Sequence, residues 1–331
     1  MILCYHHIVE VDPPDPLGVY RFRSQVETRR FEQQMEVLAR RYSIVPLHTL
    51  LAKLTSGILR AGLAAVTFDD GYADNYEVGF PTLRRLGIPA TIYLTTGYID
   101  SGMPFWMDRL AWLLSRHAGE VLSVSPELGG DNIDLSSRER VVEIHFKLRE
   151  RLRTLDRVGR ERFLNAVSPE SPPPSVGRPL TWEGASEMQR QGVSFGAHSQ
   201  WHSSLVALAN PVLKNEIEAS RDRIIARLGS RPVTFAYPYG HVDERVSRAV
   251  EVAGFLGAVT VRPELCSGAS PRYLLPRVQV GNWDRDTFTK TLDTLGNKPN
   301  HIGSLLKCVL PPSVWPAGRR IRNLMRRRHS R

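Results

Sequence analysis

Short apolar runs alternate with amphipathic stretches along most of the chain. Residues 29–42 are typical of the amphipathic stretches, because Phe31, Met35 and Leu38 fall on one face of a helix. Strands that alternate with helices in this way predict a parallel βα fold. Seven apolar runs are predicted as buried strands: residues 2–5, 64–68, 89–95, 193–197, 232–236, 257–261 and 277–280. Helices are predicted over residues 29–42, 75–86, 104–116, 211–228 and 243–253.

One segment interrupts this alternation. Residues 101–190 separate two predicted strands by far more than an ordinary βα connection. The amphipathic helix predicted over residues 104–116 is followed by a long, charged helical stretch over residues 136–167. Because the apolar content of the segment is thin, we expect a helical insertion over one mouth of the core domain, not a separate domain.

Composition narrows the class of protein. The 331 residues are 42% hydrophobic, which is enough for one large core. No stretch approaches the ~18 apolar residues of a membrane span. The apolar start lacks the charged region and cleavage site of a signal peptide, so we expect the core domain to stay in the cytoplasm. Cys4, Cys266 and Cys308 are too few and too far apart for a disulfide framework or a zinc ribbon.

The basic character of the chain lies mostly at its end. The net charge is +10, and removing the seven arginines of the last thirteen residues leaves 10 − 7 = +3. We therefore divide the chain into a core domain, residues 1–295, and a basic tail, residues 296–331. The tail is either an interfacial segment that holds the protein near anionic lipids, a non-specific nucleic-acid contact or a solvated extension. A nucleic-acid function is disfavoured, because the excess charge is confined to the tail.

The first chemical signal is Asp69-Asp70-Gly71, directly after the strand of residues 64–68. Two adjacent carboxylates repel, so they need a cation or a shared proton. With a divalent metal, one aspartate ligates the ion and the other stays available as a base. The alternative is that one aspartate caps the helix that follows.

The second signal follows another predicted strand, where His198 and His202 stand four residues apart. On a helical backbone the two imidazoles share one face and can meet one metal ion, although such a pair is also common on surfaces. The carboxyl ends of parallel strands lie at one face of the sheet. Asp70, His198 and His202 would then form a His₂–carboxylate set of the kind that binds zinc.

The third signal is Tyr237-Pro238-Tyr239-Gly240, after the strand of residues 232–236. Its rings could form the wall of a groove, and its backbone N–H groups could face a developing oxyanion. The alternative is an ordinary strand-to-helix turn with aromatic packing.

The three motifs, in this order and each at a strand end, resemble the polysaccharide deacetylase family of carbohydrate esterases, which includes chitin, peptidoglycan and nodulation-factor deacetylases. The resemblance spans roughly residues 1–280. It implies an α/β fold, a deformed (β/α) barrel of about seven parallel strands. It implies a divalent metal, commonly Zn²⁺, on Asp70, His198 and His202. It also implies Asp69 as general base and the Tyr239 N–H as an oxyanion donor.

The sequence departs from the family pattern at two points. Many members carry an arginine where this chain has Ala236, and we expect Arg277 to supply that charge to the base. The late His motif that provides the general acid is also missing. Because the first and last strands of a closed barrel are neighbours, we predict His6 as the acid, with His7 as the reserve. The alternative for His6 is a histidine buried in the core.

The resemblance implies a metal-dependent N-deacetylase of a glycan or glycoconjugate, in surface or exopolysaccharide biosynthesis. If the tail holds the protein near anionic lipids, a lipid-linked oligosaccharide at the inner membrane leaflet is a natural substrate. One alternative is a decayed carbohydrate-binding protein, which Ala236 and the missing acid favour. Another is a hydrolase of a different non-peptide C–N bond. Four aromatic residues are predicted to stack on sugar rings: Trp106, Trp201, Tyr237 and Tyr239.

Overall fold

The computed structural model describes residues 1–10, 25–123, 132–170, 172–173 and 176–297. The predicted tail lies outside the described residues from position 298 onward, and so do its predicted lipid and nucleic-acid contacts. None of the described helices is both long and apolar enough to cross a bilayer.

Parallel strands form the centre of the molecule and confirm the predicted deformed β/α barrel. Their order is β11-β10-β9-β6-β5-β1-β12, and the short strand β4 (Ser43–Ile44) pairs with β5 at one end. The first strand lies between β5 and the last strand, with Leu3 opposite Val278 and Cys4 opposite Gln279. The seven strands are β1 (Ile2–Tyr5), β5 (Leu63–Phe68), β6 (Ala90–Leu94), β9 (Ser194–Ala197), β10 (Thr234–Ala236), β11 (Gly257–Val259) and β12 (Val278–Gln279).

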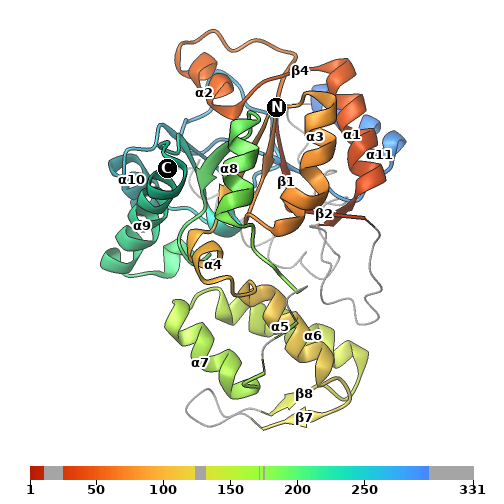
Figure 1. The fold of residues 1–331 in the computed structure, drawn as a ribbon, viewed down its shortest axis with the longest axis vertical. Helices are drawn as coiled ribbons and strands as arrows, with labels where there is room; N and C mark the ends of the chain where they lie inside the picture. The colour runs from red at the N-terminus through yellow and green to blue at the C-terminus, as the bar shows by residue number, and fades with distance from the viewer. Residues whose placement is uncertain (11–24, 124–131, 171, 174–175, 298–331) are drawn as a thin grey trace, which may run out of the picture.

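Helices surround this sheet and bury its outer face (Figure 1). Phe31 and Met35 of α1, Met188 of α8 and Ile217 of α9 belong to one continuous apolar core with the strands. The predicted helix over residues 75–86 begins with a π-helical turn, η1 (Asn75–Gly79). The helices of this layer are α1 (Thr28–Arg41), α2 (Leu47–Thr55), α3 (Phe80–Leu86), α8 (Trp182–Arg190), α9 (Asn210–Leu228), α10 (Glu244–Val252) and α11 (Arg285–Asn297).

A helical lobe lies at one end of the barrel (Figure 1). It consists of α5 (Trp106–Arg116), α6 (Arg138–Leu152), α7 (Arg157–Val167) and the antiparallel pair β7 (Val121–Leu122) and β8 (Ile133–Asp134), and α4 (Thr96–Ser101) leads into it. The lobe has its own apolar cluster, which includes Trp106, Leu110 and Phe163. It is therefore better packed than its thin apolar pattern suggested.

The structure refines two boundaries within this segment. The helical stretch predicted over residues 136–167 is two helices, because the chain turns after α6 and Asp156 caps α7 by accepting from the Gly159 N–H at 2.8 Å. Helix α8, inside the predicted insertion of residues 101–190, packs with the barrel through Ala185 and Met188. The lobe thus ends before α8.

Close packing of β9 generates the first prediction. A Cβ atom on Gly196 would lie 2.4 Å from the Tyr93 ring and 2.9 Å from the Thr234 carbonyl oxygen. Gly196→Ala should therefore lower the free energy of unfolding by about 1–3 kcal/mol, measured by urea denaturation. The control is Gly268→Ala, because nothing lies within 4 Å of its added Cβ. Equal unfolding free energies for the two variants would contradict the packing of β9 against β6 and β10.

Candidate active site

The carboxyl ends of β1, β5, β9 and β10 surround one pocket of about 290 Å³. The pocket is lined by His6, the two aspartates after β5, the two histidines after β9 and Tyr239. Parallel strands place these ends at one face, as the sequence motifs require. The helical lobe completes the wall with Met107, Asp108, Ala111, His145 and Arg149.

The turns that carry these side chains hold an unusual backbone. Four non-glycine residues with positive φ occur in the described chain, and all four lie in these turns: Asp70 (73°), Ser199 (64°), His202 (53°) and Tyr239 (60°). This region costs a non-glycine residue about 1–3 kcal/mol. Because all four strained residues lie around the same pocket, the surrounding structure must hold their backbone in place, which is typical of a functional site.

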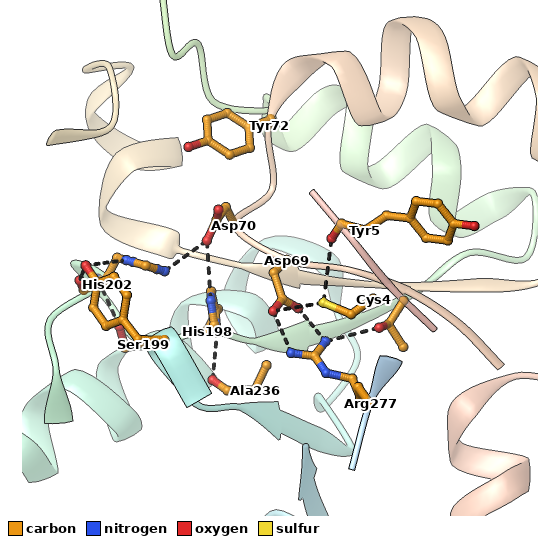
Figure 2. Close-up of polar contacts among 12 residues, drawn as sticks. Cys4, Tyr5, Asp69, Asp70, Tyr72, His198, Ser199, His202, Ala236 and Arg277 are labelled. Atoms are coloured by element: carbon orange, nitrogen blue, oxygen red, sulfur yellow. Dashed lines mark hydrogen bonds and ion pairs between the residues drawn. The ribbon is translucent and has the colours of Figure 1, made fainter. Parts of the chain in front are cut away.

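Asp70, His198 and His202 converge at the base of the pocket (Figure 2). Oδ1 of Asp70 lies 3.3 Å from Nε2 of His198 and 3.0 Å from Nε2 of His202, and all three side chains are buried. Burial raises the pKa of Asp70, but His202 and His198, when they are protonated, outweigh burial and hold that pKa well below its usual range.

The other nitrogen of each imidazole fixes its orientation. Nδ1 of His198 lies 2.7 Å from the Ala236 carbonyl oxygen and donates a hydrogen bond to it. Nδ1 of His202 lies 3.0 Å from the Tyr239 hydroxyl. Because this hydroxyl donates its hydrogen bond to the His202 carbonyl oxygen, it accepts a hydrogen bond from Nδ1. Both Nε2 atoms then present lone pairs, which is the arrangement of metal-bound histidines.

These lone pairs leave Oδ1 of Asp70 without a hydrogen-bond donor among the described residues. A buried carboxylate oxygen that faces two imidazole lone pairs is stable only if a cation lies between them. The three side chains therefore fit a divalent metal ion, with two nitrogen ligands, one oxygen ligand and room for water.

Asp69 is held separately, by Arg277 (Figure 2). The Arg277 guanidinium donates to Oδ1 at 2.6 Å and to Oδ2 at 2.5 Å, and it also donates to the Thr67 hydroxyl and the Thr260 carbonyl. Burial raises the pKa of Asp69, but Arg277 outweighs burial, so the pKa is lowered and Asp69 stays ionised. The contact predicted between Arg277 and Asp69 is thus present, and Ala236 is buried in β10.

His6 lies beside Cys4 and Asp69. A nitrogen of His6, Sγ of Cys4 and an oxygen of Asp69 lie within 4.8 Å of one another. This set is a poor metal site, because Arg277 occupies both Asp69 oxygens and burial raises the pKa of the Cys4 thiol well above its usual range. Burial also lowers the pKa of His6.

His7 has a different environment. Its Nδ1 lies 2.6 Å from Oδ2 of Asp74, and its ring stacks on Tyr72 with 3.7 Å between the ring centres. Burial lowers the pKa of His7, but Asp74 more than compensates, with help from Asp108 and Asp70, and raises it to about 9. His7 therefore carries a charge at neutral pH as part of an ion pair.

Of the four aromatic residues predicted to stack on sugars, Tyr239 alone lies in the pocket wall. Trp106 is buried in the apolar cluster of the lobe. Tyr237 lies on the same side of its strand as Phe235, under the helices, and its hydroxyl donates to the Tyr273 carbonyl at 3.0 Å. Trp201 lies outside the pocket lining, 3.9 Å from the Arg157 guanidinium carbon.

Two buried charged residues that no motif indicated hold the loop between the histidines. Arg160 of α7 donates to the carbonyl oxygens of His202 (3.1 Å) and Trp201 (2.6 Å). Glu216, on α9, holds the same loop by accepting two hydrogen bonds: its Oε2 accepts from the N–H groups of Gln200 (2.9 Å) and Trp201 (2.8 Å). The lobe and the barrel thus both fix the histidine loop.

Comparisons with known proteins agree with this architecture. A deformed parallel barrel with an Asp–His–His set at its strand ends defines the class: a parallel α/β barrel with a candidate metal centre. The sequence profile described as polysaccharide deacetylase matches residues 57–258. The chain belongs to the polysaccharide deacetylase family.

The individual relatives share little sequence identity with this chain. YxkH of Bacillus subtilis (strain 168), described as a polysaccharide deacetylase, is 22% identical over 217 residues, which are 65% of this chain and 50% of that protein. The Streptococcus pyogenes deacetylase PplD, solved in complex with acetate, has a TM-score of 0.61 at 19% identity and covers 88% of this chain and 96% of its own. IcaB from Ammonifex degensii has a TM-score of 0.57 at 20% identity, with 88% and 94% covered.

The grip of Arg160 on the histidine loop generates a prediction. Arg160→Gln removes the planar fork that holds two carbonyl oxygens of the loop. We expect zinc affinity, measured by competition with a chelator, to fall about 10–100-fold, as for other groups that orient metal ligands. Arg162→Gln is the control, because Arg162 is exposed on the same helix. Unchanged zinc affinity in the Arg160 variant would contradict the role.

The His7–Asp74 pair generates a prediction about pH. Because the pKa of His7 rises from 6.5 to about 9 on folding, its stabilisation is complete below pH 6.5 and is lost as the pH rises through about 9. His7→Gln should therefore cost about 2–3 kcal/mol of unfolding free energy at pH 6 and much less at pH 10. Urea denaturation of both proteins across this range measures the difference. A difference that did not change with pH would rule out the ion pair as its source.

Proposed function

We propose that the protein is a metal-dependent N-deacetylase that removes acetyl groups from an N-acetylated glycan or glycoconjugate. One observation carries the proposal: two adjacent buried carboxylates have separate partners. Asp70 faces His198 and His202, whereas Asp69 is paired with Arg277. This division supplies a metal ligand and an ionised base at one pocket. Membership of the deacetylase family supports the same reaction class.

The proposed ion is zinc, because two imidazoles and one carboxylate with an open position form a common catalytic zinc site. When bound, such an ion acidifies water and polarises the acyl carbonyl. The remaining chemistry belongs to the side chains of this chain. Asp69 accepts the proton of the attacking water, and Arg277 keeps Asp69 ionised and aimed at the pocket.

The oxyanion and the leaving group have candidate partners. The N–H of Tyr239 makes no hydrogen bond to another described residue, and its positive φ places it in the turn beside the histidines. We assign it to the developing oxyanion. We assign His6 to the leaving nitrogen, to which it gives a proton, because His6 lines the pocket beside Asp69. His7 is less suitable, because Asp74 already holds its ring nitrogen.

The substrate that we propose is a polymer or lipid-linked sugar of surface or exopolysaccharide biosynthesis. The family supports an acetylated polysaccharide. A decayed carbohydrate-binding protein is less well supported, because a binding protein does not need this base, its arginine and three metal-ligand candidates in one pocket.

A pair of substitutions tests the division of roles. Asp69→Asn should retain one zinc ion but lower acetate release from chitin oligosaccharides about 10²–10⁴-fold, because only the base is lost. Asp70→Asn should lose both stoichiometric zinc and activity. Acetate release and metal content are measured on the same preparations, with circular dichroism to establish folding.

Full activity in a folded Asp69→Asn variant would contradict the proposal. A wild-type protein that binds zinc and glycan but releases no acetate would instead support the binding protein.

A further inference from the structure

The helical lobe presents arginine side chains to the candidate active site. Arg149, on α6, lines the same pocket as Asp70, His198 and His202 and is half-buried. Its positive charge acts on the Tyr239 hydroxyl and favours a lower pKa there. Burial has the larger effect, so the pKa of Tyr239 is raised. The lobe therefore adds a positive charge to a pocket whose metal-ligand candidates come from the barrel.

Arg149 has no acidic partner among the described residues, in contrast to two other arginines, Arg277 and Arg109. Arg277 is paired with Asp69, and Arg109 of the lobe is paired with Glu161 at 2.9 Å. The pocket acids also have other partners: Asp108 accepts from the Tyr72 hydroxyl at 2.9 Å, and Asp69 is held by Arg277. A guanidinium that lines a pocket and has no acidic partner can direct its N–H groups to an anionic ligand.

A second arginine, Arg153, lies near Tyr239 of the pocket wall. Arg153 follows Arg149 by four residues, and its guanidinium carbon lies 5.9 Å from the centre of the Tyr239 ring. It pairs with Glu150, whose side chain is 59% exposed, so this ion pair is weak and easily exchanged. An arginine held over an aromatic face keeps N–H groups at its edge for a ligand.

We propose that the lobe recognises an anionic group, a carboxylate or a phosphate, on the acetylated glycan through Arg149, with Arg153 extending the subsite. The inference rests on the proposed function, because it takes the sugar to be the ligand of this pocket. Guanidinium groups bind both anions with two parallel hydrogen bonds, which suits a planar cation at a pocket wall. The substrate class is thus an acidic glycan or a sugar joined to phosphate, and neutral chitin-like chains are poorer ligands.

The test compares matched ligands on the full-length, zinc-loaded protein by isothermal titration calorimetry. Chitotetraose is the neutral probe, a hyaluronan tetrasaccharide carries carboxylates, and UDP-N-acetylglucosamine carries phosphate. We expect at least one anionic probe to bind about tenfold more tightly than chitotetraose. Arg149→Gln should reduce that preference to near one, whereas Arg149→Lys should restore part of it. The anionic probe that shows the preference identifies its source.

Arg138→Gln is the matched control, since it removes the same charge from an exposed position on α6. The proposal is overturned if the wild type shows no preference for either anionic probe. It is also overturned if Arg149→Gln keeps the preference, as it would if the metal ion alone bound the anion, or if Arg138→Gln abolishes the preference equally.

Acetate release from each probe, measured in parallel, separates this inference from the proposed function. An Arg149-dependent preference without acetate release would leave the anion subsite standing and remove the deacetylase. Acetate release without a preference for an anionic probe would support the deacetylase and remove the anion subsite.

Discussion

Two adjacent carboxylates are buried at the end of one strand, and the structure around them depends on neutralising each one separately. Asp69 receives the guanidinium of Arg277, and Asp70 lies beside His198 and His202, with which it can hold a metal cation. Neither solution is available within β5 itself. The first needs the last strand of the barrel beside β1, and the second needs β9 on the other side. The order of the strands thus brings to each of the two buried aspartates the partners that stabilise it.

The helical lobe contributes to the site as well as to the fold. Its helix α7 holds the histidine loop through Arg160, and its helix α6 lends Arg149 to the pocket wall. Because the lobe has an apolar cluster of its own, these two side chains are carried on a packed support. The histidine loop and the pocket wall therefore both depend on the same inserted segment.

Local patterns predicted the barrel well, because each strand is short, apolar and followed by a turn, and parallel strands must end at one face. The same logic placed Asp69, Asp70 and the two histidines together. Two buried charged residues that hold the histidine loop, Arg160 and Glu216, escaped prediction. Arg160 and Glu216 lie in ordinary charged helices, and their buried hydrogen bonds leave no local signal. Tyr237 was misplaced as a groove residue, because the alternation of β10 turns its ring under the helices, where it packs with Phe235.

The central claim is that Asp70, His198 and His202 bind one metal ion. X-ray absorption spectroscopy of the zinc-loaded protein tests it most directly, because the method reports the atoms bound to the metal. The account predicts one zinc per chain, with two imidazole nitrogens and carboxylate and water oxygens at about 2.0–2.2 Å. Sulfur ligands, or a protein that retains no zinc, would contradict it.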